Sequence, residues 1–148
     1  MVEESRQLLR KVLKNNGHSL TEQRNIVFDL LWDEEPLSMR ELSDRSKELL
    51  DRASLYRTIA LYEKLGLVQR IYIGWKYKVE LSDVLTTYHH HHISCLGCGK
   101  VIAVTEEYEI ECLINSLVDR YGFVTTNHQL EIQGYCSQCS KLTGGQAG

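Results

Sequence analysis

The chain has 148 residues, of which 43% are hydrophobic and 25% charged, and its formal net charge is −3. This composition is that of a soluble globular protein with one ordinary domain or two small ones. No apolar run approaches the roughly 20 residues that cross a bilayer, and the first residues form a charged amphipathic pattern unlike a signal peptide, so we expect no membrane segment and a cytoplasmic location.

The charges are divided unevenly along the chain. Residues 1–80 carry 14 lysines and arginines against 13 aspartates and glutamates, whereas residues 81–148 carry 3 against 7. This asymmetry indicates a first half that faces nucleic acid and a second half that faces cations. The sequence pattern also changes near residue 80, where we place a domain boundary.

Short helices are predicted in the first 50 residues. Leucines and valines at helical spacing mark residues 3–15 as a helix. Thr21 is placed to cap a second helix. Ser38 with Glu41 is the capping-box pattern of a third helix, which we expect over residues 38–50.

A fourth helix and a hairpin follow. The segment DRASLYRTIALYEKLG has one apolar side and closes at Gly66, and β-branched and aromatic residues then flank Gly74, which predicts a β-hairpin turn there. Helices followed by a two-stranded wing describe a winged helix-turn-helix with the fourth helix in the recognition position. The side chains expected to face DNA are Arg52, Ser54, Tyr56 and Arg57, together with Arg70, Lys76 and Lys78 of the wing. The alternative is a helical bundle with solvated basic side chains.

The chain after residue 80 has a mixed pattern. We expect a strand at residues 101–104, an amphipathic helix at residues 106–120, and one or two strands in residues 123–135. The helix should turn its apolar side inward, with Cys112 as a small buried hydrophobe. The predicted fold class is therefore α+β, with an α/β domain second.

Four of the five cysteines form two Cys-x-x-Cys pairs, Cys95 with Cys98 and Cys136 with Cys139. Disulfides do not persist in a reducing cytoplasm, and two residues between ligands let both sulfurs reach one tetrahedral ion. Thiolates prefer zinc, so the pairs predict one closed, structural Zn(2+) site. The alternative is a set of redox dithiols.

Four adjacent histidines, His89 to His92, run directly into the first cysteine pair. Side chains alternate along a strand, so His89 and His91 face one side and His90 and His92 the other, and one strand can serve two metal sites. Imidazole with carboxylate suits Zn(2+), Fe(2+), Mn(2+) or Co(2+). The available partners are His128, Glu106, Glu107, Glu109 and Glu111 for one side and Glu80 and Asp83 for the other.

These parts together resemble the ferric uptake regulator superfamily of metal-dependent repressors. The resemblance covers nearly the whole chain and rests on the segments TEQRNIVFDLL, ASLYRTIALYEKLGLV, HHHHISCLGCGKVI, TNHQLEIQGYC and CSQC. It implies a homodimer with a winged-helix DNA-binding domain at residues 1–80 and a metal-binding dimerisation domain at residues 81–148. The implied function is metal-responsive repression of metal-homeostasis genes at A·T-rich, near-palindromic double-stranded operator DNA, without enzyme activity.

The resemblance also implies roles for individual residues, and Tyr56 and Arg57 match its DNA-contacting positions. Three metal sites are implied: structural zinc at Cys95, Cys98, Cys136 and Cys139; a second site at His89, His91, Glu111 and His128; and a regulatory site at Glu80, His90 and His92. Asp83 is the other candidate acid for the regulatory site.

Departures from the family pattern bear on the sensed signal. Pro36 stands near the place of a histidine found in many members, with Glu34 or Glu35 as substitute ligands, and Ala103 replaces an acidic residue. Peroxide-sensing members rely on those two ligands, and zinc-sensing members often use a hinge cysteine that this sequence lacks. Iron or manganese is therefore slightly favoured over zinc as the regulatory ion. The alternatives are a peroxide- or redox-responsive regulator, a member without metal regulation, and a metal-dependent hydrolase.

Overall fold

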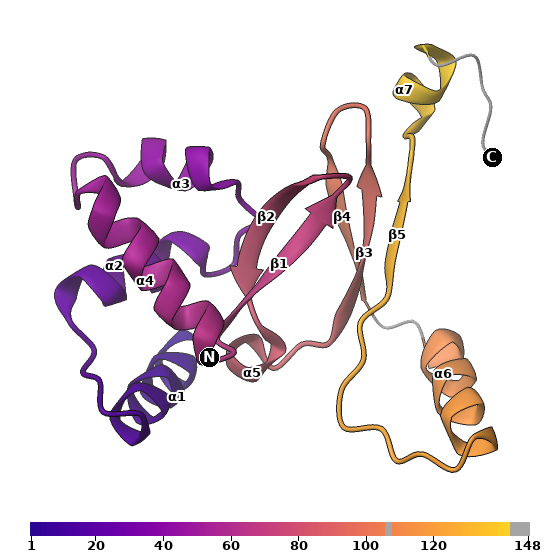
Figure 1. Cartoon of the computed structure of the whole chain (residues 1–148), viewed down its shortest axis with the longest axis horizontal. Helices are drawn as coiled ribbons and strands as arrows, with labels where there is room; N and C mark the ends of the chain where they lie inside the picture. Colours follow the sequence, from indigo (N-terminus) through magenta and orange to yellow (C-terminus); the bar gives the residue numbers. More distant parts are fainter. Residues whose placement is uncertain (106–107, 143–148) are drawn as a thin grey trace. The chain divides into compact units, whose positions relative to one another are not determined.

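The structure is a computed structural model of the chain that describes residues 1–105 and 108–142 (Figure 1). It divides into two compact units, of which the first is Met1–Tyr88 and the second begins at His89. This division lies beyond the boundary that we placed at residue 80. Helix α5 (Asp83–Thr86) accounts for the difference, because it packs on α1 and β2 and the Ser5 hydroxyl donates a 2.6 Å hydrogen bond to its Leu85 carbonyl.

The first unit contains four helices and a hairpin before α5. Its elements are α1 (Val2–Asn15), α2 (Glu22–Leu31), α3 (Met39–Ser46), α4 (Arg52–Lys64), β1 (Val68–Ile73) and β2 (Lys76–Leu81). The expected caps are present, since Thr21 accepts a hydrogen bond from the Arg24 N–H at 3.3 Å and Ser38 and Glu41 form a complete capping box. Helix α3 ends at Ser46, earlier than the sequence suggested.

The hairpin pairs β1 and β2 in antiparallel register, from Val68 opposite Leu81 to Ile73 opposite Lys76. Its turn lies at Gly74, as expected, with a φ of 63° that favours glycine. An additional bridge, which the sequence did not suggest, joins Leu37 and Val79 by two backbone hydrogen bonds of 2.9 and 2.7 Å. The bridge holds the segment before α3 against the hairpin.

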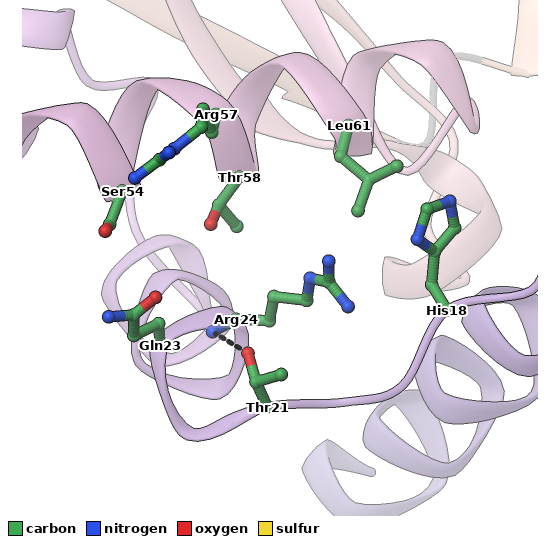
Figure 2. Close-up of a pocket in the computed structure, with 8 residues that line it drawn as sticks. All are labelled: His18, Thr21, Gln23, Arg24, Ser54, Arg57, Thr58 and Leu61. Atoms are coloured by element: carbon green, nitrogen blue, oxygen red, sulfur yellow. Dashed lines mark hydrogen bonds between the residues drawn. The ribbon is translucent and has the colours of Figure 1, made fainter.

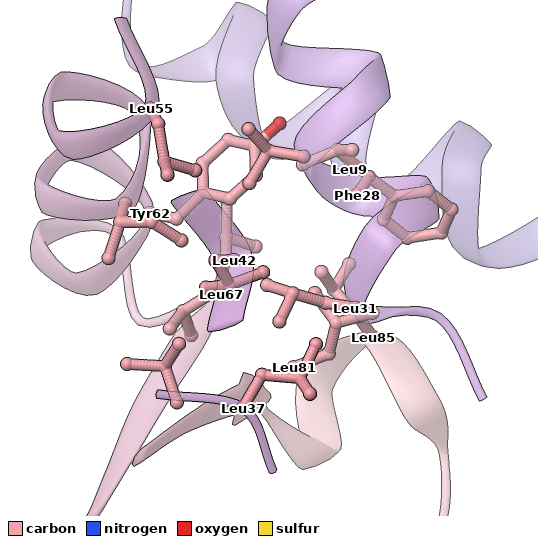
Figure 3. Close-up of a cluster of buried hydrophobic side chains, with 14 of the residues drawn as sticks. Leu9, Phe28, Leu31, Leu37, Leu42, Leu55, Tyr62, Leu67, Leu81 and Leu85 are labelled. Carbon is pink, nitrogen blue, oxygen red and sulfur yellow. The ribbon is translucent and has the colours of Figure 1, made fainter. Parts of the chain in front are cut away.

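The core of the first unit lies between its helices and the hairpin (Figure 3). Leu55 and Tyr62 of α4 are completely buried there together with Leu9 of α1 and Phe28 of α2. Burial of each such side chain stabilises the fold by roughly 1.5–3 kcal/mol. The inner side of α4 is therefore fixed by packing, and its other side remains available for recognition.

The second unit is built around a three-stranded sheet of order β4-β3-β5. Its elements are β3 (His90–Cys95), β4 (Val101–Thr105), α6 (Tyr108–Arg120), β5 (Glu131–Gly134) and α7 (Ser137–Leu142). Strand β3 pairs with β4 antiparallel and with β5 parallel, and α6 lies in the long connection that a parallel pair requires. Of the one or two strands expected in residues 123–135, β5 is present, and α7 was not expected.

Helix α6 corrects the prediction for residues 106–120. Residues 106 and 107 lie outside the described part of the chain, so Glu106 and Glu107 are not placed. The apolar side of α6 is not turned inward in the single chain: Leu113 is 70% exposed, and Cys112 is exposed rather than buried. Helical spacing shows which residues share a side, but it does not show what covers that side.

The helices are short, and α1, with 14 residues, is the longest of those described. A helix that crosses a bilayer needs about 20 residues. No helix of the described residues has the length and apolar character needed to span a membrane.

Candidate functional site

Four cysteine sulfurs meet at one end of the three-stranded sheet. The Sγ atoms of Cys95, Cys98, Cys136 and Cys139 all lie within 4.8 Å of one another. Parallel pairing of Cys95 with Gly134 aligns the end of β3 with the end of β5, and the Leu96 N–H donates to the Gly134 carbonyl at 2.7 Å. The two Cys-x-x-Cys segments are thereby brought together from distant parts of the chain.

Backbone donors and neighbouring sulfurs change the acidity of this cluster. The Cys136 N–H donates to the Cys95 sulfur at 3.3 Å and, with further N–H groups, lowers the pKa of Cys95 to about 6. Hydrogen bonds with Cys136 and Cys95 raise the pKa of Cys139 to about 12. Four thiolates repel one another unless a cation neutralises them, and this donor set fits tetrahedral Zn(2+) with no open position.

Gly97 allows the first cysteine pair to approach the second. A Cβ atom added at Gly97 would lie 2.8 Å from both Cβ and Sγ of Cys139, closer than real Cβ contacts. Gly99 adopts a φ of 75°, which side chains rarely tolerate. A side chain at Gly97 would clash with Cys139, and a side chain at Gly99 would strain the backbone, so both positions require glycine.

A second cluster lies where β3, α6 and the segment before β5 meet. Its members, with one ligand atom each within 4.8 Å of the others, are His89, His91, Glu111 and His128. The Glu111 Oε1 atom lies 2.7 Å from Nε2 of His91 and 3.2 Å from Nε2 of His128. The Nε2 atoms of His89 and His128 are 2.9 Å apart. Three imidazoles and one carboxylate converge on one point, which suits a divalent ion.

The charge state of Glu111 reflects these contacts. Partial burial raises its pKa, but hydrogen bonds with His91 and His128 outweigh this effect and hold the pKa below its usual value. The carboxylate is therefore ionised at neutral pH. An ionised carboxylate beside imidazole nitrogens is prepared for metal coordination.

His90 and His92 form a separate pair on β3, with ring centroids 4.7 Å apart, while the rings of His89 and His91 are 4.8 Å apart. This is the expected alternation along the strand. Glu80 is buried on β2 in the first unit, where it accepts a 2.7 Å hydrogen bond from Gln69. The regulatory site suggested by the sequence would combine an acidic residue of the first unit with His90 and His92 of the second. This site stays a prediction, and so does the choice of Glu80 or Asp83 as its acidic ligand.

Helix α4 presents the residues expected to contact DNA. Tyr56 is 40% exposed, the Arg52 guanidinium lies 5.5 Å from its ring centroid, and Arg57 is exposed. Ser54 is buried instead, and both its N–H and its hydroxyl donate to the Asp51 carboxylate. The Asp51 carboxylate caps α4, a signal in the sequence that we did not use.

The wing differs from expectation in two side chains. Both Nε and Nη2 of Arg70 donate to the Glu63 carboxylate, at 2.5 and 3.0 Å, so Arg70 is held within the unit. Trp75, which the sequence did not single out, is 88% exposed at the tip beside Lys76. That Lys76 and Lys78 of the wing face DNA stays a prediction.

Comparison with known protein families shows to which family a chain with this fold and these ligand clusters belongs. The model of the ferric uptake regulator family matches residues 15–133, which include most of both units. The chain belongs to the ferric uptake regulator family. The resemblance stated from the sequence, the α+β class and the function of a metal-responsive, DNA-binding transcriptional regulator are thus confirmed.

Individual members of the family agree with this assignment. The ferric uptake regulation protein of Yersinia pestis is 33% identical over 133 residues, 85% of this chain and 86% of that protein. The ferric uptake regulator of Helicobacter pylori, described as having three functional metal binding sites, superposes with a TM-score of 0.76 at 26% identity, over 95% of this chain and 94% of that one. The Vibrio cholerae regulator superposes with a TM-score of 0.70 at 29% identity, over 86% and 98%.

Proposed function

We propose that this regulator represses metal-homeostasis genes by binding operator DNA as a homodimer when a divalent ion is bound. The observation that carries the proposal is strand β3, which supplies ligand residues to both the cysteine cluster and the histidine-carboxylate cluster. A metal-binding sheet in the same chain as a winged helix couples metal availability to DNA recognition.

The proposed metal sites follow the three ligand groups of the sequence. Cys95, Cys98, Cys136 and Cys139 would hold a structural Zn(2+), which closes the end of the sheet. His89, His91, Glu111 and His128 would hold a second ion, and Glu80, His90 and His92 the regulatory one. The three functional metal binding sites described for the Helicobacter pylori relative support this division.

The regulatory group would link the two domains. Glu80 comes from the hairpin strand β2, and His90 and His92 come from β3. Ligands shared between domains favour one arrangement over others, so ion binding shifts the population toward that arrangement. The coupling is reciprocal, and operator DNA must therefore raise the affinity for the ion by the same factor.

DNA recognition would be carried by α4 in the major groove, with Tyr56 and Arg57 at the contact. Two copies related by a two-fold axis match a near-palindromic site, for which we propose an A·T-rich sequence. Contacts of Arg and Lys with phosphates make the affinity fall as salt rises. We propose a cytoplasmic location, where the operator is found.

For the regulatory ion we favour Fe(2+) or Mn(2+) over Zn(2+), since the proposed ligands are imidazoles and a carboxylate without a thiolate. A peroxide-responsive regulator is less well supported, because Ala103 pairs with His92 in the sheet and brings no acidic ligand there. A hydrolase is least supported. Glu111 contacts the imidazoles of its cluster, which makes this carboxylate a ligand rather than a general base.

The test is an anaerobic mobility-shift assay on A·T-rich promoter fragments with protein that keeps its zinc but has lost its exchangeable ions. Restoring Fe(2+), Mn(2+) or Zn(2+) singly should produce tight binding with one of them. A His90→Ala/His92→Ala variant should lose this dependence. Equal binding without any added ion would contradict metal regulation, and absence of binding in every state would contradict the repressor itself.

A further inference from the structure

The hairpin of β1 and β2 (Figure 1) has one side that is committed to the core of the first unit. Val68 of β1 and Val79 and Leu81 of β2 all belong to that core. Gln69 follows Val68, and Glu80 lies between Val79 and Leu81. Since side chains alternate along a strand, Gln69 and Glu80 share the opposite side of the hairpin. A slip of one residue would turn Glu80 into the core, so packing fixes its side.

Gln69 and Glu80 also stand directly opposite each other in the antiparallel register. The Nε2 atom of Gln69 donates a 2.7 Å hydrogen bond to Oε1 of Glu80. Side chains that oppose each other on one face of an antiparallel pair are close enough to interact. The bond therefore holds the Glu80 carboxylate from the neighbouring strand.

The chemistry of this partner matters because Glu80 is only 6% exposed. A buried carboxylate is costly unless hydrogen bonds compensate it. The Gln69 amide supplies one such bond without a positive charge, whereas Arg70, the next residue, gives a full charge to Glu63. A carboxylate has about four acceptor sites, of which this bond uses one. The bond leaves the attraction of Glu80 for a cation in place.

We propose that Gln69 is a positioning residue for the regulatory ion, whose amide orients the Glu80 carboxylate for coordination without neutralising it. This inference rests on the proposed function, because it requires Glu80 to be the acidic ligand. Carboxylate ligands of metal ions are themselves hydrogen-bonded in proteins, and loss of such a partner weakens metal binding by roughly ten- to a hundredfold.

The experiment is a calorimetric titration with Mn(2+) of full-length, zinc-containing protein that carries Glu111→Gln, so that the second site does not contribute. In this parent protein, Gln69→Met keeps the length of the side chain but removes the donor. Its affinity for Mn(2+) should be roughly ten- to a hundredfold weaker than that of the parent. Gln7→Met makes the same change at an exposed position of α1 and should keep the affinity of the parent.

Gln69→Lys separates positioning from a structural role. A lysine can also donate to Glu80, so a residue needed only for that hydrogen bond would be replaced better by lysine than by methionine. The positioning role predicts the reverse, because the ammonium group neutralises the carboxylate and repels a divalent ion. The Mn(2+) affinity should therefore fall in the order parent, Gln69→Met, Gln69→Lys.

An unchanged Mn(2+) affinity in Gln69→Met would overturn the inference and leave the proposed function intact. An affinity of Gln69→Lys equal to or above that of Gln69→Met would also overturn it, as would loss of the circular dichroism of the folded parent in Gln69→Met. Glu80→Gln tests the assumption beneath the inference. If Glu80→Gln keeps the affinity of the parent, Glu80 is not the acidic ligand, and the proposed regulatory site fails together with the inference.

Discussion

The hydroxyl of Tyr62 on α4 donates a 2.7 Å hydrogen bond to the backbone carbonyl of Arg24 on α2. The Tyr62 side chain is completely buried, and burial raises the pKa of its hydroxyl. The bond therefore joins the recognition helix to the first turn of α2 inside the core. It also sets the position of Arg24, whose side chain lines a hollow between α2 and α4 (Figure 2).

Tyr62→Phe should lower the free energy of unfolding of the first unit by about 1 kcal/mol, because the aromatic packing is kept and one buried hydrogen bond is lost. Urea denaturation followed by circular dichroism measures this change. Tyr121→Phe, at a ring that is 71% exposed, is the control and should change stability by less than about 0.5 kcal/mol. Equal effects of the two substitutions would argue against the buried bond.

The capping box of α3 should make stability depend on pH. The Ser38 N–H donates to the Glu41 carboxylate at 2.7 Å and lowers the pKa of Glu41 below its usual 4.5. A lowered pKa in the folded state means that the ionised carboxylate stabilises the fold above pH 4.5, and that this stabilisation is lost as pH falls through the lowered value.

Glu41→Gln should therefore be less stable than wild type at neutral pH. The free energies of unfolding of the two proteins should become equal in acid, below the usual pKa of a glutamate. Urea titrations at neutral and acidic pH test the sign of this effect. Glu48→Gln removes an exposed carboxylate just beyond α3 and should give no comparable convergence. If the stability difference between wild type and Glu41→Gln grew in acid, the ionised Glu41 carboxylate would not be the stabilising group.

Gly97→Ala should weaken the zinc site, because its new Cβ would meet Cys139 at 2.8 Å. We expect zinc affinity to fall by about tenfold or more, as measured by competition with a chromophoric chelator. Gly134→Ala is the matched control, since a Cβ there would meet nothing within 4 Å. Unchanged zinc affinity in Gly97→Ala would mean that the two cysteine pairs do not share an ion.

Glu111→Gln should empty the second metal site and spare the zinc of the cysteine cluster. The amide keeps the size of the side chain but loses the charge that interacts with His91 and His128. The metal content per chain after dialysis, measured by mass spectrometry, should fall by one ion. If the ion is retained, the affinity of the site for it should be roughly ten- to a hundredfold weaker. Glu109→Gln changes an exposed glutamate of the same helix and should keep the wild-type content.

Arg57→Gln should weaken operator binding by about tenfold or more and reduce the salt dependence, since it removes a positive charge from the exposed side of α4. Lys141→Gln removes the same charge from α7 in the second unit and serves as the control. Both variants should keep wild-type metal content and circular dichroism. A larger loss of operator affinity in Lys141→Gln than in Arg57→Gln would mean that α4 does not make the main DNA contact.

Local signals were sufficient to predict most of the first unit from the sequence. The cap at Thr21, the Ser38 and Glu41 box and the turn at Gly74 act within a few residues, so their outcome does not depend on the rest of the fold. The alternation of the four histidines is local in the same sense. The sequence alone therefore sorts the candidate metal ligands of this strand into two groups.

Distant contacts could not be predicted in this way. The bridge between Leu37 and Val79 and the parallel pairing of β3 with β5 join segments that are far apart in the chain, and no local pattern specifies them. Arg70 illustrates the same limit, because its ion pair with Glu63 of α4 was not visible in the sequence; its predicted contact with DNA stays a prediction. The exposure of Leu113 and Leu117 on α6 was likewise not predicted, because helical spacing gives the apolar side of a helix but not what packs against it.

The uncovered side of α6 has a consequence for the abundance of this protein. Members of its family bind DNA as dimers, and a partner copy that covered Leu113 and Leu117 would stabilise the folded state by an amount that rises with the logarithm of the protein concentration. Dilution would then separate the two copies and destabilise the second unit at the same time. In that arrangement the number of copies in a cell would set a threshold below which the regulated genes are released, even when the metal is plentiful.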